Sequence, residues 1–504
     1  MSEEEFKNEE LVELDDQTGL IGSVLYNPDL APVPIKNRNW KTFTFAALWM
    51  SMSANISTYM LASGLMTEGM SSLQALGTIA LGNVIVLAPI LLNSHPGTKY
   101  GIPFPVFARA AYGTFGSNLP ALMRAVVACG WFGIQAWIGG QALDLMFNTI
   151  YPGWKNLLGP EVAGFTPTTW ISFFLFWLLN ILVIYRGMGL VRKLAMTAAP
   201  FVFLMTLAMV FWAINTANGI GNLLSHPGKL NTLSSFLPVF IPSLSAVIGG
   251  WATLSLNMPD FTRFGRSQKE QTIGQAAALP TSMTLYSGMG VVITSAAMLI
   301  YPNMPNSDLW DPIKLAGQFD NAFIVVLAMF TICVATLSVN IAANVVSPAN
   351  DFANAFPRWI SFKTGGLITG IIGILMHPWR ILSDAAAYIF SWLQGYSGGL
   401  GSIAGVLIVD YWLLRKKELA LKDLYQEHGV YRYKNGWNPK AVVATLLGCG
   451  AAWIGLVIPG LRFLYDYAWF LGVGVSAISY YLLMINEIKP IEGREDAGTK
   501  QTQN

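Results

Sequence analysis

The sequence predicts an all-α integral membrane protein with twelve transmembrane helices, and three observations support this fold class. The 504 residues are 53% hydrophobic and only 12% charged, whereas soluble domains carry about 25% charged residues. The mean hydropathy is +0.48. The apolar runs follow one another without an intervening soluble domain, and each is long enough for a hydrocarbon core about 30 Å thick, which takes roughly 20 helical residues.

Twelve apolar runs follow a polar, acidic N-terminal arm, in which we find no apolar core of a cleaved signal peptide. We expect the spans near 43–66, 71–92, 117–150, 168–186, 190–217, 236–258, 274–300, 320–346, 364–382, 384–414, 440–460 and 465–486. Because twelve is an even number, both ends of the chain are expected on the same side of the membrane.

Basic residues predict which side that is. Of the 30 Lys and Arg residues, 24 fall in the arm, the tail and the alternate loops on one side, and five fall in the opposite loops. Arg124 lies within the start of the third span. Since loops rich in Lys and Arg stay in the cytoplasm, we expect a multi-pass protein of the cytoplasmic (inner) membrane with both termini cytoplasmic.

The segment 131–140 (WFGIQAWIGG) in the third span carries the first candidate binding residues. Trp131 and Gln135 are four residues apart, so they share one face of a helix. A carboxamide at mid-membrane depth is costly unless it is paired, so Gln135 should point into the protein. An indole beside an amide suits a flat, uncharged ring that contains amide groups. A glutamine that joins two helices, with a tryptophan as packing, is an equally good interpretation of this segment alone.

Two spans are poor continuous helices. The first has Ser51, Ser53 and Asn55 at its centre, and the sixth has small residues that end in Gly249 and Gly250. Backbone freed from a helix at membrane depth is tolerated only where it lines a cavity. Breaks in the first and sixth spans hold matching places in a five-plus-five inverted repeat, with the binding site at the broken helices. The alternative is that the glycines merely allow close helix packing.

This interpretation divides the chain into five parts: a cytoplasmic arm (1–40), a first repeat of helices 1–5 (41–217), a second repeat of helices 6–10 (236–414), a cytoplasmic loop with helices 11 and 12 (415–486), and a cytoplasmic tail (487–504).

The eighth span contributes Asn340, Asn344 and Ser338 within an otherwise apolar run. Asparagine can form a paired hydrogen bond with an amide-type ligand, and a serine oxygen is a hard ligand for a small cation. Small and polar residues also occur at ordinary helix contacts, so this segment by itself leaves both interpretations open.

Other function classes find little support in the sequence. We find no carboxylate at the centre of a span for a proton relay, no nucleotide-binding loop and no nucleophile–base or zinc motif. The three cysteines lie singly in apolar runs and predict neither a disulfide nor a metal site. A channel needs a continuous polar lining, whereas the polar residues here cluster at mid-membrane. A transporter is favoured over an enzyme, a receptor or a channel.

Six segments resemble the nucleobase–cation–symport type-1 family (purine-cytosine permeases), and among its members the bacterial allantoin permeases and the hydantoin or dihydropyrimidine transporters. The similarity extends over about residues 28–486. Its strongest segments are 95–105 (HPGTKYGIPFP), 131–135 (WFGIQ), 250–253 (GWAT), 257–264 (NMPDFTRF), 340–348 (NIAANVVSP) and 410–417 (DYWLLRKK).

The resemblance implies the leucine-transporter type of fold, a five-plus-five inverted repeat with two extra C-terminal helices. It also implies that the ligand ring lies between two tryptophans, Trp131 and Trp251, and that polar contacts come from Gln135, the Gly250 backbone and Asn344. Asn55 is expected to border the site. Ile389 is expected to close over the ligand from helix ten.

The family's sodium site implies carbonyl ligands at Ser51, Ala54 and Ala335 and a hydroxyl at Ser338. A second hydroxyl ligand of the family is replaced here by Val339, which removes one oxygen. A water molecule or Ser53 is the alternative source of this oxygen. Sodium coupling, proton coupling and weak coupling are all left open by the sequence.

The expected function is import of a small neutral cyclic ureide, such as allantoin, a hydantoin or a dihydropyrimidine, by alternating access. A permease for uracil, cytosine or a purine is the alternative. We expect no cofactor other than a coupling ion such as Na⁺, a lipid bilayer as surroundings, no nucleic acid, and no obligate protein partner.

Overall fold

The computed structural model describes residues 11–14, 16, 18–186, 188–217, 219, 227–488 and 499–502. The rest of the predicted arm (1–10, 15 and 17) and most of the predicted tail (489–498 and 503–504) lie outside the described residues. The limits assigned above to the five parts of the chain stay predictions.

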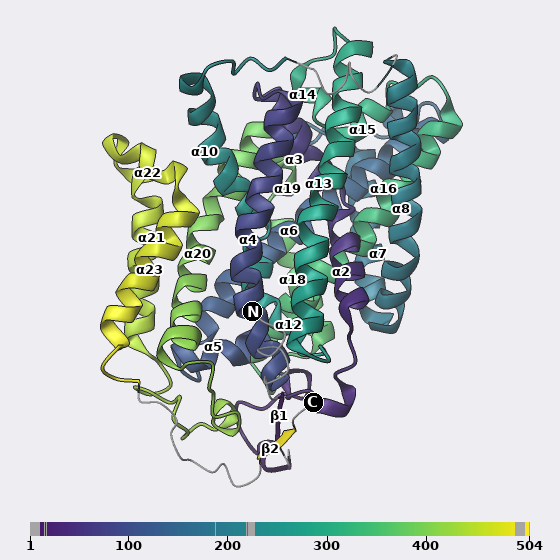
Figure 1. Ribbon diagram of the computed structural model, residues 1–504. Coiled ribbons are helices and arrows are strands. Elements are labelled where there is room, and N and C mark those ends of the chain that lie inside the picture. The colour runs from purple at the N-terminus through teal and green to yellow at the C-terminus, as the bar shows by residue number, and fades with distance from the viewer. Residues whose placement is uncertain are drawn as a thin grey trace.

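The first five predicted spans are all occupied by helices (Figure 1). They are α2 (Thr42–Ser53) with α3 (Ile56–Thr67), α4 (Ser72–Tyr100), α6 (Asn118–Ile150), α7 (Pro167–Arg186) and α8 (Met188–Thr216). The second span is longer than expected, because α4 continues past residue 92 to Tyr100 and ends at Gly101, whose φ of +69° a glycine adopts without strain. A short helix, α5 (Phe104–Tyr112), follows it.

Helices also occupy the other seven predicted spans. They are α10 (Leu233–Gly250) with α11 (Ala252–Asn257) and α12 (Pro259–Thr262), α13 (Gln268–Ile300), α16 (Ala322–Asn344) with α17 (Val346–Ala355), α18 (Phe362–Leu375) with α19 (Pro378–Ile381), the π-helical η5 (Ala387–Leu393) with α20 (Gln394–Ile408) and the π-helical η6 (Val409–Leu414), α21 (Pro439–Val457), and α22 (Arg462–Asp466) with α23 (Ala468–Met484). Two short helices, α14 (Asn306–Leu309) and α15 (Pro312–Ala316), precede α16.

Length and composition separate these spans into two kinds. Among the described residues, eight helical segments are long and apolar enough to cross a membrane by themselves, and the pair Pro459–Asp466 and Ala468–Met484, bent by 87°, makes a ninth. The other three predicted spans are the broken pair α2 and α3, the apolar stretch Phe201–Thr216 of α8, and the short α18. The multi-pass helical fold is therefore confirmed.

The first predicted break is present and is held by one side chain. α2 ends at Ser53 and α3 begins at Ile56. Between them Asn55 accepts a hydrogen bond from the Thr58 backbone N–H (2.9 Å) and donates one to the Met52 carbonyl (2.5 Å). Asn55 is thus the N-cap of α3 and also a partner for a carbonyl that the end of α2 leaves free.

The second predicted break lies at the glycines only. α10 continues without interruption through Ser243 and Ser245 and ends at Gly250, and α11 starts at Ala252. Gly249 has a packing reason, because a Cβ at this position would lie 2.4 Å from the Leu393 carbonyl oxygen. α10 can approach the chain at Leu393 so closely only without a side chain at this point.

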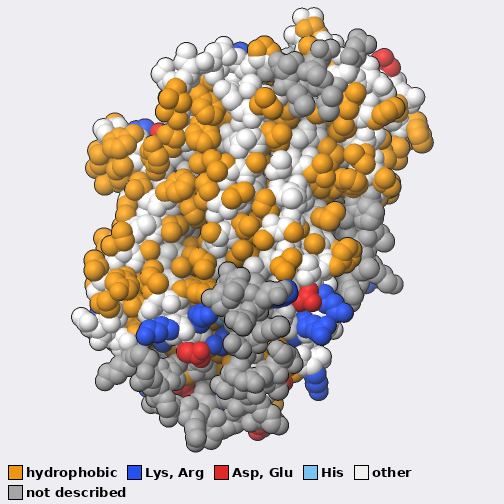
Figure 2. Space-filling view, in the orientation of Figure 1, with side chains coloured by type: hydrophobic (Ala, Val, Ile, Leu, Met, Phe, Trp, Pro, Cys, Tyr) orange, Lys and Arg blue, Asp and Glu red, His pale blue; other side chains and the backbone are white. Residues whose placement is uncertain are grey.

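One end of the bundle is basic and carries a small sheet. The strands β1 (Leu11–Leu14) and β2 (Thr499–Thr502) pair antiparallel below the helices in Figure 1. In Figure 2 the Lys and Arg side chains gather at this lower end, below a wide apolar surface. Arg38 is buried here and donates to the carbonyls of Val12, Val33 and Thr98. Burial lowers the pKa of Arg38 to about 10, so this group stays cationic at neutral pH.

Candidate functional site

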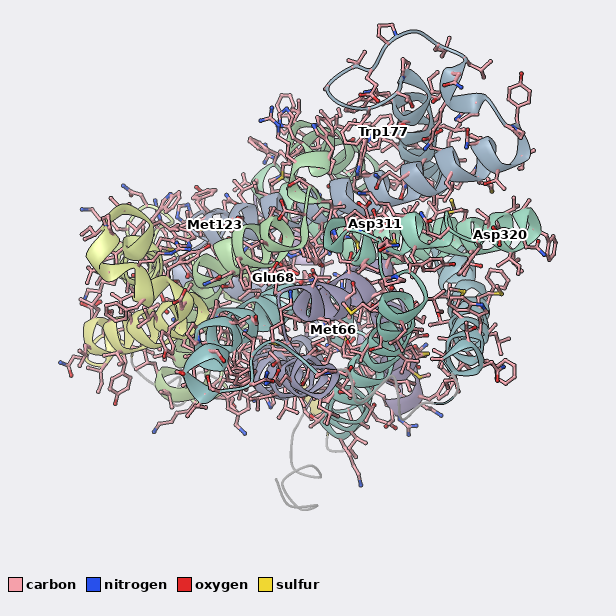
Figure 3. All side chains as sticks on the ribbon, turned by 90° about the horizontal axis from the view of Figure 1, so that it is seen from above. Met66, Glu68, Met123, Trp177, Asp311 and Asp320 are labelled. Atoms are coloured by element: carbon pink, nitrogen blue, oxygen red, sulfur yellow. The ribbon has the colours of Figure 1, made fainter. Side chains whose placement is uncertain are left out.

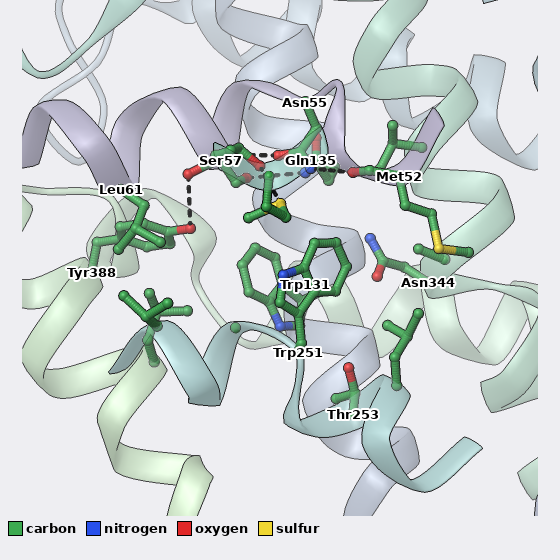
Figure 4. Close-up of a pocket in the computed structure, with 18 residues that line it drawn as sticks. Met52, Asn55, Ser57, Leu61, Trp131, Gln135, Trp251, Thr253, Asn344 and Tyr388 are labelled. Atoms are coloured by element: carbon green, nitrogen blue, oxygen red, sulfur yellow. Dashed lines mark hydrogen bonds between the residues drawn. The ribbon is translucent and has the colours of Figure 1, made fainter. Parts of the chain in front are cut away.

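The two helix breaks face a cavity of about 60 Å³ (Figure 4). It is enclosed by α2, α3, α6, α10, α11, α13, α16 and η5. Its walls are apolar, aromatic, hydroxyl and carboxamide groups, and none of the described lining residues is charged. The lining residues are Met52, Asn55, Ser57, Thr58, Leu61, Trp131, Gln135, Val247, Gly250, Trp251, Thr253, Leu254, Met283, Val339, Ala343, Asn344, Tyr388 and Leu393.

Two indoles form the aromatic part of the wall, and they come from different elements. Trp131, on α6, donates its Nε1–H to the Tyr396 hydroxyl (3.0 Å) and stands perpendicular to Tyr388, with ring centroids 6.2 Å apart. Trp251 lies at the break between α10 and α11 and packs edge-on against Trp49, with centroids 5.2 Å apart. Neighbouring aromatic groups hold both indoles in place. Their faces are therefore already positioned to stack on a ligand before it binds.

Three carboxamides, those of Asn55, Gln135 and Asn344, are among the polar groups of the lining. Gln135, only 2% exposed, donates Nε2–H to the Ser57 hydroxyl (3.0 Å), and its Oε1 has no hydrogen-bond partner among the described residues. Asn344, on α16, donates to Asn340 Oδ1 (3.1 Å). Figure 4 shows the Asn344 carboxamide directed toward the two indoles. A ligand that fills this cavity would therefore meet aromatic faces and amide groups, without a charge.

The chain matches the family model described as permeases for cytosine/purines, uracil, thiamine and allantoin over residues 32–472. It is 41% identical to the allantoin permease of Bacillus subtilis, covering 91% of this chain and 93% of that one. The purine-uracil permease NCS1 of Arabidopsis thaliana is 38% identical, with 91% and 78% covered. The chain belongs to this permease family.

A solved structure of the family has the same fold. Mhp1, a nucleobase-cation-symport-1 transporter in a closed conformation with bromovinylhydantoin bound, superposes with a TM-score of 0.74 at 25% identity, covering 91% of this chain and 95% of Mhp1. The resemblance inferred from the six sequence segments is confirmed. The chain is therefore a transporter and not an enzyme.

The structure brings six of the seven predicted binding residues of this permease to one cavity, and they are Asn55, Trp131, Gln135, Gly250, Trp251 and Asn344. They come from four separate segments of the chain, so the fold and not sequence proximity assembles them. Asn55 differs from the others, because both ends of its carboxamide already hold the break between α2 and α3. What each residue contributes to binding stays a prediction.

The seventh residue, Ile389, is not among the residues that line the cavity, and its closing over the ligand stays a prediction. Ile389 is fully buried and packs on α3, where a Cβ at Gly64 would lie 2.9 Å from its Cδ1. The neighbouring Tyr388 lines the cavity instead and donates to the Ser57 carbonyl (3.4 Å). η5 is π-helical, and its wider turn shifts which side chain faces a given neighbour, a shift that α-helical spacing does not predict.

Packing also brings in residues that the sequence analysis did not select. Four hydroxyl groups are added to the lining, by Ser57, Thr58, Thr253 and Tyr388. Ser57 follows Asn55 directly beyond the break, so its place at the start of α3 was the available signal. From above, the end of this helix, marked by Met66 and Glu68, lies near the middle of the bundle (Figure 3).

The residues expected to bind sodium lie where α2 ends and along α16. Ala54 and Ala335 belong to one buried cluster. Ser338 Oγ is buried and has no hydrogen-bond partner among the described residues. At the end of α2 the carbonyls of Met50, Met52 and Ser53 accept hydrogen bonds, and for that of Ser51 we find no partner within the described chain. These free oxygens fit a cation better than an apolar contact.

Val339 and Ser53 do not contribute oxygen atoms to the expected sodium site. Val339 supplies no oxygen and lines the cavity with its apolar side chain. Ser53, which we considered as a substitute ligand, is instead within 2.8 Å of the Ser282 hydroxyl on α13. Two of the expected ligand oxygens, the Ser51 carbonyl and Ser338 Oγ, thus lack a hydrogen-bond partner among the described residues. Val339 removes one oxygen from the ligand set that the resemblance implies.

A buried ion pair outside the cavity was also missed. Arg124 on α6 and Asp351 on α17 are both fully buried, with Nη1 and Oδ2 3.4 Å apart. The partners are 227 residues apart in the sequence, so neither periodicity nor a motif links them. Removing one partner of such a pair costs about 3–5 kcal/mol, because the other charge is left buried and unpaired.

We predict that adjacent glycines respond oppositely to substitution. A Cβ at Gly250 meets no atom within 4 Å, so Gly250→Val should fold normally while its side chain occupies the cavity and blocks uptake. Gly249→Val should yield little folded protein, because of the Leu393 carbonyl. Thermal melting and uptake of labelled ligand by the two variants test this. Full uptake by a stable Gly250→Val protein would show that ligand does not bind in this cavity.

Proposed function

We propose that this permease imports a small, neutral cyclic ureide across the cytoplasmic membrane by alternating access, with allantoin, hydantoins and dihydropyrimidines as the substrate class. The single observation that carries the proposal is the uncharged cavity that combines two indoles with carboxamides. Allantoin in the name of the Bacillus subtilis relative and the hydantoin bound to Mhp1 support the same class.

Each group in the cavity has a role in this proposal. Trp131 and Trp251 stack on opposite faces of the ring, and stacking adds about 0.5–1.5 kcal/mol beyond the burial of area. Gln135 and Asn344 bind the polar edge of the ring. At Gly250 the absence of a side chain lets the ring approach the backbone.

A nucleobase permease is the second candidate, since the Arabidopsis thaliana relative is named a purine-uracil permease. Uracil has the same alternation of N–H and C=O groups as a dihydropyrimidine.

The proposed orientation has both termini in the cytoplasm. The basic lower end of the bundle in Figure 2 would then face the cytoplasm, as loops rich in Lys and Arg do. The partners of the protein in this proposal are its small-molecule substrate and the bilayer, without nucleic acid and without an obligate protein subunit.

We predict that a competition panel separates the candidates. Uptake of labelled allantoin into cells or liposomes is measured against unlabelled allantoin, hydantoin, dihydrouracil, uracil and cytosine. Ureides and dihydropyrimidines should compete best. Trp131→Ala should abolish uptake because a stacking surface is lost, while membrane insertion is retained. Competition by cytosine and uracil alone would favour the nucleobase permease, and uptake unchanged in Trp131→Ala would contradict the stacking role.

Coupling to sodium is proposed to be weak. Ser338 Oγ and the carbonyls of Ser51, Ala54 and Ala335 would hold Na⁺, and the missing hydroxyl at Val339 leaves a poorer shell. When bound, Na⁺ would supply a positive charge that holds α16 against the end of α2. By linkage, any gain in ligand affinity from sodium equals the gain in sodium affinity from ligand, so a weak ion site means a small effect.

We therefore predict modest or no sodium stimulation in the natural protein and a larger one in Val339→Thr. Ligand affinity is measured in both proteins across a sodium series at constant ionic strength. The matched control is Val325→Thr, elsewhere on α16, which should behave like the natural protein. Stimulation of the natural protein by tenfold or more, without a further gain in Val339→Thr, would show that the missing hydroxyl has no effect.

A further inference from the structure

A chain of three asparagines leads from α7 to the cavity, and a backbone carbonyl sets its direction. Asn180 is fully buried and donates its Nδ2–H to the Phe176 carbonyl (2.8 Å). A carbonyl can only accept a hydrogen bond, so Asn180 must turn its Oδ1 away from Phe176. That oxygen accepts from Asn340 Nδ2 (3.0 Å).

A second carbonyl sets the same direction at Asn340. The Nδ2 of Asn340 also lies 3.3 Å from the Phe132 carbonyl on α6. Its Oδ1 therefore faces the other way and accepts from Asn344 Nδ2 (3.1 Å). The usual ambiguity between the oxygen and the nitrogen of an amide is removed here, because two backbone acceptors determine it. Asn344 is thus left with Oδ1, and one N–H, to offer to a ligand.

Gln135 is held from the opposite wall by a hydroxyl group and not by a backbone carbonyl. Its Nε2 donates to the Ser57 hydroxyl (3.0 Å), and its Oε1 is buried without a hydrogen-bond partner in the described part of the chain. A buried acceptor without a donor is costly, so this oxygen is suited to an N–H group of the ligand. One N–H of Asn55 is already used by the Met52 carbonyl, at 2.5 Å from Nδ2.

We propose that the cavity selects its ligand by N–H groups, since the hydrogen bonds behind it make Gln135 and Asn344 present acceptor oxygens. Ser57, Asn340 and Asn180 act as positioning residues for this selection. The inference rests on the proposed function and narrows it: the substrate is a ring with unsubstituted lactam or ureide N–H groups toward both amides. Rings alkylated at these nitrogens lose the donor and add a methyl group where an oxygen already lies.

The test compares hydantoin with 1-methylhydantoin and 3-methylhydantoin, each titrated into purified protein by calorimetry. In the natural protein each methyl group should weaken binding by about ten- to a hundredfold, as expected when a buried polar group loses its partner. In Asn340→Leu, Asn344 loses the partner that orients it and is free to rotate. This variant should therefore bind hydantoin and the methyl derivative that faces Asn344 within about threefold of each other. Asn180→Leu should have a smaller effect, because the Phe132 carbonyl still orients Asn340.

Two control variants separate positioning from a general structural effect. Thr331→Val removes a hydroxyl on the same helix as Asn340 that donates to the Leu327 carbonyl, and it should keep the discrimination. Thr336 is a buried polar residue of α16, and its hydroxyl forms hydrogen bonds within its own helix. The Thr336→Val variant should also discriminate between hydantoin and its methyl derivatives. If Asn340→Leu loses the discrimination and both control variants keep it, the loss comes from the orientation of Asn344. General destabilisation of the protein would not give this pattern.

The outcomes distinguish this inference from the proposed function. If hydantoin and both methyl derivatives bind the natural protein equally, selection by N–H groups is wrong and import of a cyclic ureide still stands. If the methyl derivatives bind more weakly but Asn340→Leu discriminates like the natural protein, Asn340 has no positioning role. If neither hydantoin nor allantoin binds the natural protein, the proposed function itself fails.

Discussion

The structure depends on how it satisfies backbone groups at two helix breaks within the apolar part of the bundle. A helix that stops there leaves N–H and C=O groups without partners, and such groups are tolerated only where protein or a cavity receives them. At the first break the Asn55 side chain binds the Met52 carbonyl and the Thr58 N–H. At the second, Gly250 leaves open space in front of the backbone. The cavity exists because these two breaks lie on opposite sides of it.

The chemistry of the cavity follows from what can be buried there. A charged group would need a partner or a large compensation, and the described lining residues carry none. Carboxamides can be oriented by hydrogen bonds behind them, as Asn344 is by Asn340. Indoles provide apolar faces that need no partner for most of their area. This combination favours a ligand that is flat, uncharged and rich in amide groups.

The sequence predicted the fold to the extent that local patterns determine it. Apolar runs located the spans, small polar residues located the first break, and the spacing of Trp131 and Gln135 indicated one shared helix face. Contacts between distant segments were not predictable in this way. Arg124 and Asp351 pair across 227 residues, Ser57 and Tyr388 join the lining through packing of η5 on α3, and the π-helix moves Tyr388 to the cavity in place of Ile389. Apart from the place of Ser57 next to the first break, none of these features has a local signal in the sequence.

The central claim is that an uncharged cavity between the two breaks binds an intact, neutral ring. The most direct test is calorimetric titration of the purified protein with allantoin and with the carboxylate formed by opening its ring. The two ligands share most of their atoms and differ in net charge. We expect allantoin to bind and the carboxylate to bind at least about 100-fold more weakly, because an unpaired buried carboxylate costs several kcal/mol. Equal binding of both ligands would contradict the account.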